Sequence, residues 1–188
     1  MVYAVIAGIS IAGIAFFSSA GFRPDIDRAL ESYRFLFKFV ITIALVASSS
    51  HVLFRIGRPG LQIKSWRWGL LAPVALIALG VAAELTAVPP DSWRARMIGH
   101  NSHLCLTLIP FLSLGPLVCF LHALREGAPE DPSLAGAIAG LAAAGIAATF
   151  YAANCNDDSP LFVMLWYPIA IGMVTAAGGL IGRWLLRW

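Results

Sequence analysis

The sequence predicts an all-α polytopic membrane protein, a single domain of six transmembrane helices over residues 1–188. Only 12% of its residues are charged and 59% are hydrophobic, and the mean hydropathy is +0.80. A soluble domain carries about 25% charged residues, so this chain cannot cover a water-facing surface. The alternating pattern of a membrane barrel is absent.

Six apolar runs without Asp, Glu, Lys or Arg predict the spans in chain order. A spanning helix needs about 17–25 mostly apolar residues. Short polar connectors separate the runs, as expected for a bundle without a soluble domain. The runs are 1–22, 39–54, 68–83, 97–124, 132–156 and 159–182.

Four of these runs reach spanning length unaided. The second reaches it if the amine of Lys38 extends to an interface, and the third if Glu84 lies near one, which predicts an interfacial carboxylate there. The first run has no positively charged start and exceeds the roughly 7–15-residue core of a cleavable signal peptide. It therefore predicts a retained helix.

The distribution of basic residues predicts the orientation. An even number of helices puts both termini on the same side. That side receives seven Lys and Arg residues and the other side six, and the connector after the fifth helix has none. This predicts cytoplasmic termini by the positive-inside rule. The basic residues form no stripe, so nucleic-acid binding is excluded.

Small residues at four-residue spacing predict close helix contacts, because they let backbones approach within lipid. We expect the fourth and fifth predicted helices to pack through Gly136 and Gly140. The other small residues at this spacing are Ala4, Gly8, Ala12, Gly178 and Gly182.

The stretch YAANCNDDSP places Cys155 in a polar connector, whereas a packing cysteine usually lies among apolar residues. The fourth and fifth predicted helices form a hairpin centred near Pro129, and nearly equal numbers of residues separate Cys105 and Cys155 from it. The two cysteines should therefore lie at the same height. Equal height is necessary for a disulfide but not sufficient, because the side chains must also face each other. Two unrelated cysteines at one level remain the alternative.

The segment HNSHLC raises a competing possibility, a soft-metal site. His100, His103 and Cys105 are suitable ligand types, and Asp157 is expected at the same level. However, His103 and Cys105 lie about 200° apart around an α-helix, so they share a metal only where the segment is unwound. Interfacial histidines at a helix start are the alternative. Cys119 lies further along the same helix and is expected to serve packing.

The ordered set of segments GFRPDI, GRPG, GHNSHLC, NCNDDSPLFVMLWYP and IGRWLLRW resembles the NrsF-type anti-sigma factors over nearly the whole chain. These are six-helix proteins of the bacterial inner membrane that restrain an extracytoplasmic-function sigma factor. The resemblance implies a regulator without enzymatic activity, so no cofactor is expected.

The resemblance further implies that an external cysteine pair, here Cys105 and Cys155, senses stress such as a heavy metal or an oxidant. If a metal binds, the candidate ligands are Cys105, Cys155 and His103. Family members carry a cytoplasmic arm before the first helix, and here that helix begins at once, so we expect this chain to bind sigma weakly or through its loops. The expected contact residues in the connector after the second helix are Arg55, Arg58, Lys64 and Arg67.

Two other classes of protein remain open from the residues alone. A membrane thiol oxidoreductase would also place cysteines at the outer surface, but it ordinarily needs a Cys-x-x-Cys pair, which this sequence lacks. A small transporter would show buried, paired ionisable groups or interrupted helices in matching halves. In the sequence, Glu84 alone approaches that description.

Overall fold

The computed structural model of the chain describes residues 1–57, 66–127 and 129–187, with the side chains of residues 66 and 67 also outside the description. The described residues form helices and no strand. Their bounds in chain order are α1 Val2–Ser19, α2 Ile26–Leu30, α3 Tyr33–Ile56, η1 Trp66–Leu70, α4 Leu71–Ala87, η2 Pro90–Ser92, α5 Trp93–Ile98, α6 Ser102–Arg125, α7 Pro132–Asn154 and α8 Pro160–Leu185.

Within the described residues, six helices are long and apolar enough to cross a membrane, which confirms the predicted all-α class and helix count. They are α1, α3, the segment Trp68–Ala87 that contains α4, α6, α7 and α8. The second predicted run was too short, since α3 begins at Tyr33 and includes Lys38. The fourth began too early, because Gly99 takes a φ of 60° and separates α5 from α6.

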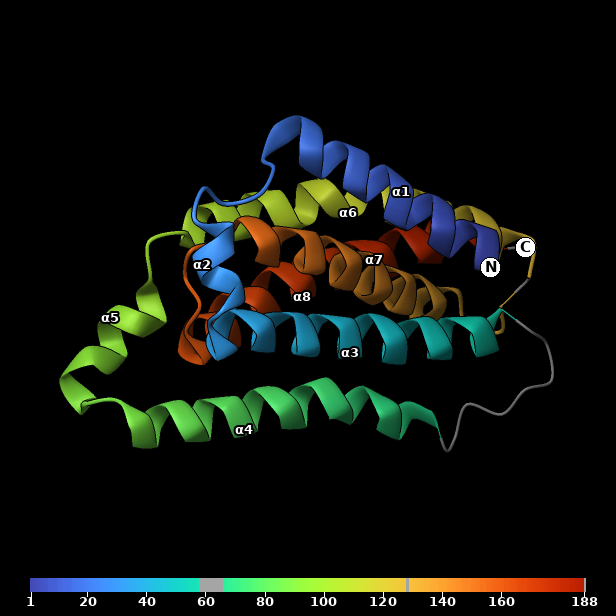
Figure 1. Cartoon of the computed structure of the whole chain (residues 1–188). Coiled ribbons are helices and arrows are strands. Elements are labelled where there is room, and N and C mark those ends of the chain that lie inside the picture. The colour runs from blue at the N-terminus through green and yellow to red at the C-terminus, as the bar shows by residue number, and fades with distance from the viewer. Residues whose placement is uncertain (58–65, 128, 188) are drawn as a thin grey trace.

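Two connectors that the sequence analysis treated as irregular contain the short helices α2 and α5. In Figure 1, α5 lies beyond the ends of the long helices, where it links α4 to α6. The indole Nε1 of Trp166 in α8 donates to the carbonyl oxygens of Met97 (3.0 Å) and Ile98 (3.1 Å). These bonds attach the end of α5 to α8.

The starts of α7 and α8 follow from local sequence. Each begins with a proline, whose missing N–H and fixed φ suit the first helical position. The residue before each proline caps the helix: Asp131 accepts from the N–H groups of Ser133 and Leu134, and Ser159 accepts from that of Leu161. Side-chain acceptors at this position satisfy donors that have no partner within the helix.

Helix α7 forms the centre of the bundle. It packs against α8, α3, α6 and α1, whereas α4 lies at the edge and contacts α3 and α8. The side of α7 that is buried is built from alanine and glycine, which explains why four helices can approach one.

The closest of these contacts joins α7 to α8 rather than to α6. A Cβ added at Gly140 would lie 2.6 Å from the carbonyl oxygen of Val174, and one at Gly182 would lie 2.7 Å from the Cα of Gly136. We expected Gly136 and Gly140 to pack against the fourth predicted helix, which is α6. This was wrong, because the two glycines pack against α8. Periodicity showed that the glycines share a face, but not which neighbour that face meets.

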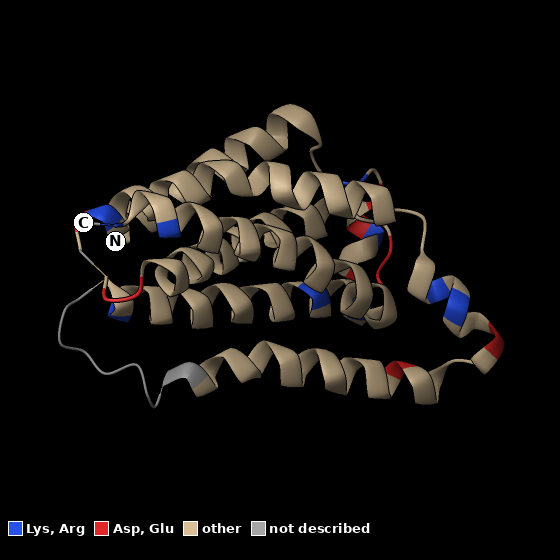
Figure 2. Ribbon diagram, turned by 180° about the vertical axis from the view of Figure 1, so that it is seen from behind, with Lys and Arg blue, Asp and Glu red and all other residues tan. Residues whose placement is uncertain are grey.

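Both termini lie at one end of the bundle, which we call the terminus end (Figure 1). The loop 155–159 between α7 and α8 lies at the opposite end, called the loop end. In Figure 2 the charged residues gather at these two ends, and the long helices between them carry few. The loop end, where Cys155 lies, is where the candidate site is found.

Candidate functional site

Cys105 and Cys155, the cysteine pair, come together beneath loop 155–159. Cys105 lies in the first turn of α6 and Cys155 directly follows α7. Their exposed fractions are 0% and 1%, and both belong to one buried cluster with Tyr151, Phe162 and Tyr167. Both are free thiols. Both cysteines therefore lie at the loop end, at the shared level that their spacing from the hairpin centre predicted.

The surroundings of Cys155 keep its thiol protonated. Burial raises the pKa of Cys155, and the nearby ammonium of Lys38 opposes this only in part. The Sγ of Cys155 contacts the carbonyl oxygen of Asp157 at 3.8 Å. Since the thiolate is the nucleophile and the metal ligand, the pair is poorly reactive while it remains enclosed.

The structure does not gather the predicted metal ligands around the pair. His103 is exposed on α6 while Cys105 faces the core, as their angular separation on a regular helix requires. His100 is 98% exposed, and its Nδ1 lies 3.7 Å from an oxygen of Asp157. Among the described residues, no group of three or more His, Cys, Asp or Glu side chains is placed to hold a metal ion.

Asp158 bridges two cations that come from other segments. Its carboxylate lies 2.9 Å from Nη1 of Arg23, which follows α1, and 2.6 Å from Nζ of Lys38 in α3. Hydrogen bonds from Arg23 to Asp25, together with its contacts to Asp158, raise the pKa of Arg23 further above its usual value. The side chain of Lys38 extends to the loop end, as expected, but it is only 1% exposed because it is buried against Asp158.

Asp157 fixes the start of α6. One carboxylate oxygen accepts from the backbone N–H of His100 (2.9 Å), the backbone N–H of Asn101 (2.8 Å) and the side-chain amide of Asn101 (2.9 Å). The carbonyl of Asn101 in turn accepts from the hydroxyl of Tyr151 at 3.1 Å. Asp157 therefore ties the segment that carries Cys105 to the loop that carries Cys155.

Ser159 connects the loop to α4 through Glu84. Its hydroxyl donates to Glu84 at 3.3 Å, and Glu84 pairs with Arg34 of α3 (2.9 Å) and Arg96 of α5 (3.2 Å). Glu84 lies in the last turn of α4, as the sequence predicted, but its side chain is buried within the protein. Two arginines and a hydroxyl satisfy it, which is how a buried carboxylate becomes tolerable.

Three successive residues of loop 155–159 thus hold the neighbouring segments: Asp157 the start of α6, Asp158 both α3 and the connector after α1, and Ser159 helix α4. The sequence analysis did not predict this pattern. The signal was present: the predicted topology put Arg23, Arg34, Lys38 and Arg96 at the same end as Asp157 and Asp158. Opposite charges that are buried at the same end of a helical bundle are expected to form ion pairs, because a buried charge without a partner is strongly unfavourable.

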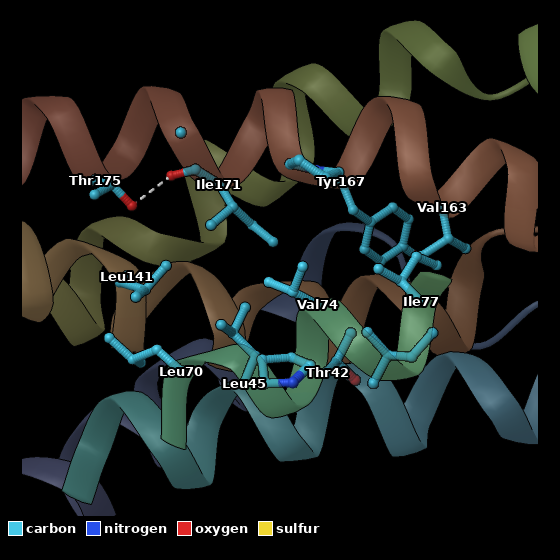
Figure 3. A pocket seen from close by; sticks show the side chains of 14 residues that line it. Thr42, Leu45, Leu70, Val74, Ile77, Leu141, Val163, Tyr167, Ile171 and Thr175 are labelled. Carbon is cyan, nitrogen blue, oxygen red and sulfur yellow. Dashed lines mark hydrogen bonds between the residues drawn. The ribbon is translucent and has the colours of Figure 1, made fainter. Parts of the chain in front are cut away.

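A cavity of about 410 Å³ lies between α3, α4 and α8, lined almost entirely by apolar side chains (Figure 3). Val74, Leu45 and Ile171 are among them, and the hydroxyl of Thr175 is already bonded to the carbonyl of Ile171 at 2.8 Å. None of the lining residues is charged. The cavity therefore has no charged group that could bind an ionic substrate.

The expected sigma-contact residues are only partly described. Arg55 lies in the last turn of α3 at the terminus end, and its Nε donates to His51 at 3.1 Å. Arg58, Lys64 and the side chain of Arg67 lie outside the described residues.

These features define an all-helical protein whose described residues include six helices long and apolar enough to cross a membrane, with a buried pair of thiols at one end. The chain belongs to the NrsF family, "Negative regulator of sigma F", whose model matches residues 1–188. It is 32% identical over 167 residues to the anti-sigma-F factor NrsF of Caulobacter vibrioides, which covers 88% of this chain and 78% of that protein. It is 30% identical over 166 residues, with the same coverage, to a probable anti-sigma-F factor NrsF of Azospira oryzae. No solved structure matches it.

The family assignment confirms the resemblance that the ordered motifs carry. The family is regulatory and not enzymatic, so the thiol oxidoreductase class is set aside. Negative regulation of a sigma factor is the function that the family supports.

Proposed function

We propose that the chain is a six-span anti-sigma factor of the bacterial inner membrane that restrains an extracytoplasmic-function sigma factor and senses external stress through Cys105 and Cys155. The two curated relatives are named for sigma F, which makes a sigma factor of that kind the expected partner. The observation that carries the sensing role is the burial of both thiols in one cluster at the loop end.

Membrane insertion and orientation are part of this proposal. The six long apolar helices match the thickness of a bilayer. With the terminus end in the cytoplasm, the loop end faces the oxidising side of the membrane, where a pair of thiols has redox chemistry available. The sigma factor then meets the terminus end, where Arg55 lies in the last turn of α3. Arg58, Lys64 and Arg67 follow Arg55 in the sequence.

The cysteine pair can respond by either of two balanced reactions. An oxidant that accepts two electrons converts two thiols to one disulfide and releases two protons. Alternatively, a soft metal ion binds both sulfurs and displaces the same two protons. Each reaction draws the end of α7 toward the start of α6.

The contact between α7 and α8 can transmit a structural change from Cys155 at the loop end to the terminus end. Their backbones meet through Gly136, Gly140, Gly178 and Gly182, with no side chain to absorb a shift. A displacement at Cys155 therefore moves a rigid helix pair whose far ends, Pro132 and Leu185, lie at the terminus end. Coupling of this kind needs an element with two arrangements, and the helix pair is the candidate.

The test is transcription from a sigma-dependent promoter in cells exposed to an oxidant or a soft metal ion. We expect Cys105→Ser, Cys155→Ser and the double variant to abolish the response equally, because either change removes the link. Cys119→Ser, in the same helix as Cys105, serves as the control and should respond normally. Single variants with different effects, or a full response without either cysteine, would contradict the proposal.

Partner binding is tested separately by co-purification of the sigma factor. Alanine at Arg55, Arg58, Lys64 and Arg67 together should reduce recovery of the sigma factor, because charged side chains near an interface raise the association rate and specificity. Alanine at the exposed loop-end residues Arg28 and Arg94 is the matched control. Equal recovery from both variants would move the contact surface elsewhere.

A further inference from the structure

The backbone carbonyl of Cys155 is held by two buried cations. Nζ of Lys38 donates to this oxygen at 2.9 Å and Nη1 of Arg23 at 3.3 Å. The donors come from α3 and from the connector after α1, far apart in sequence from Cys155. They fix the point at which the chain leaves α7 and closes over the thiols.

One carboxylate, that of Asp158, contacts both cations. Lys38 and Arg23 are 1% and 7% exposed, and Asp158 lies within 3 Å of each. Asp25 also pairs with Arg23, but it is half-exposed and contacts neither Lys38 nor Cys155 in the described hydrogen bonds and ion pairs. Asp158 is therefore the acid that neutralises the buried side of this cluster.

We propose that the triad of Arg23, Lys38 and Asp158 is a latch that keeps the cysteine pair enclosed and sets how readily it reacts. Its regulatory meaning rests on the proposed function, whereas its effect on thiol exposure does not. The latch is distinct from the ion pairs of Glu84, which connect α4 to α3 and α5 without contacting Cys155.

Loss of the Asp158 charge should open the latch. A buried cation whose partner is removed is strongly unfavourable, so Lys38 would turn toward water, while Arg23 would stay paired with Asp25. The carbonyl of Cys155 would then lose its closer donor, Lys38, and the loop would lose both ion pairs made by Asp158. Local opening of this kind raises the fraction of molecules in which Cys155 is accessible.

The latch also opposes any reaction that requires Cys155 to leave its place. By linkage, a modification that favours the open state is itself favoured when the latch is weakened. Weakening it should therefore lower the dose of oxidant or soft metal needed for a given degree of thiol reaction.

The experiment measures labelling of Cys155 by a membrane-impermeant maleimide in membranes, using a variant with serine at Cys105 and Cys119. We expect Asp158→Asn to raise the labelling rate by roughly tenfold or more, because the open fraction controls the rate. Asp25→Asn removes the same charge from the same arginine and should change the rate by less than about twofold, because the buried pair remains. Labelling of Cys119 in a Cys119-only variant reports general loosening of the bundle.

Faster labelling of Cys155 with Asp158→Asn, slow labelling with Asp25→Asn and unchanged Cys119 support the latch. Equal rates for the two asparagine variants would overturn it. If Asp158→Asn also exposes Cys119, the test is repeated with Lys38→Met, in which Arg23 still neutralises Asp158. An unchanged labelling rate of Cys155 in this variant would also overturn the latch. The labelling experiment does not involve the sigma factor. If the labelling rates change as expected but the cells show no stress response, the proposed function is refuted and the latch is not.

Discussion

Close contact between α7 and α8 predicts that a single methyl group at Gly182 will separate the two helices. A Cβ at Gly182 would lie 2.6 Å from the carbonyl oxygen of Pro132 and 2.7 Å from the Cα of Gly136. Ordinary contact begins near 3.4 Å, so Gly182→Ala requires a movement of about 0.8 Å. Both neighbours are backbone atoms, which cannot rotate away as a side chain can.

The expected cost is that of overpacking, about 1–3 kcal/mol. Gly172 lies in the same helix with nothing within 4 Å of an added Cβ, so Gly172→Ala is the matched control. Both substitutions gain the same helix propensity, roughly 0.8–1.0 kcal/mol. The difference between the two variants therefore isolates the packing term.

Equilibrium unfolding in detergent micelles, followed by far-ultraviolet circular dichroism, measures both variants against the native chain. We expect Gly172→Ala to be as stable as the native chain or more so, and Gly182→Ala to be less stable than Gly172→Ala by about 1–3 kcal/mol. Equal stability of the two variants would refute the close helix contact and the route through α8 that depends on it.

Other predictions concern charge, pH and orientation. Glu84→Gln should lower the free energy of unfolding by roughly 1–3 kcal/mol, since its arginine partners lose a buried acceptor, while Glu31→Gln at an exposed position should have little effect; equal losses would contradict this. Burial raises the pKa of Cys155, so its contribution to stability is present below the unfolded pKa of about 8.5 and is lost as pH rises toward the folded value. The free energy of unfolding of the native chain relative to Cys155→Ser should therefore fall as the pH rises above about 8.5, and a constant difference would disprove it. In a chain whose native cysteines are serine, His100→Cys should react with an impermeant reagent in intact cells, and Arg187→Cys only after permeabilisation; both positions are exposed, and labelling of both from outside would reject the proposed orientation.

The sequence by itself determined the helical class, the number of long helices and the level of the two cysteines. Apolar runs long enough to span a bilayer are stable there as α-helices, because each helix satisfies its own backbone hydrogen bonds. The spacing of Cys105 and Cys155 about Pro129 fixed their heights, since each residue of a helix advances the chain by the same rise. The ordered motifs also carried the family, which the comparisons confirm.

Tertiary structure alone decided which side chains meet. Small-residue periodicity gave α7 a glycine face, but the identity of the helix against it depends on rotation about the helix axis, which sequence spacing leaves open. In the same way, Lys38 and Glu84 read as interfacial residues because a lone charge in an apolar run is costly. Their partners, Asp158 in loop 155–159 and Arg34 in α3, come from other parts of the chain, and a buried charge becomes stable only when the fold supplies such a partner.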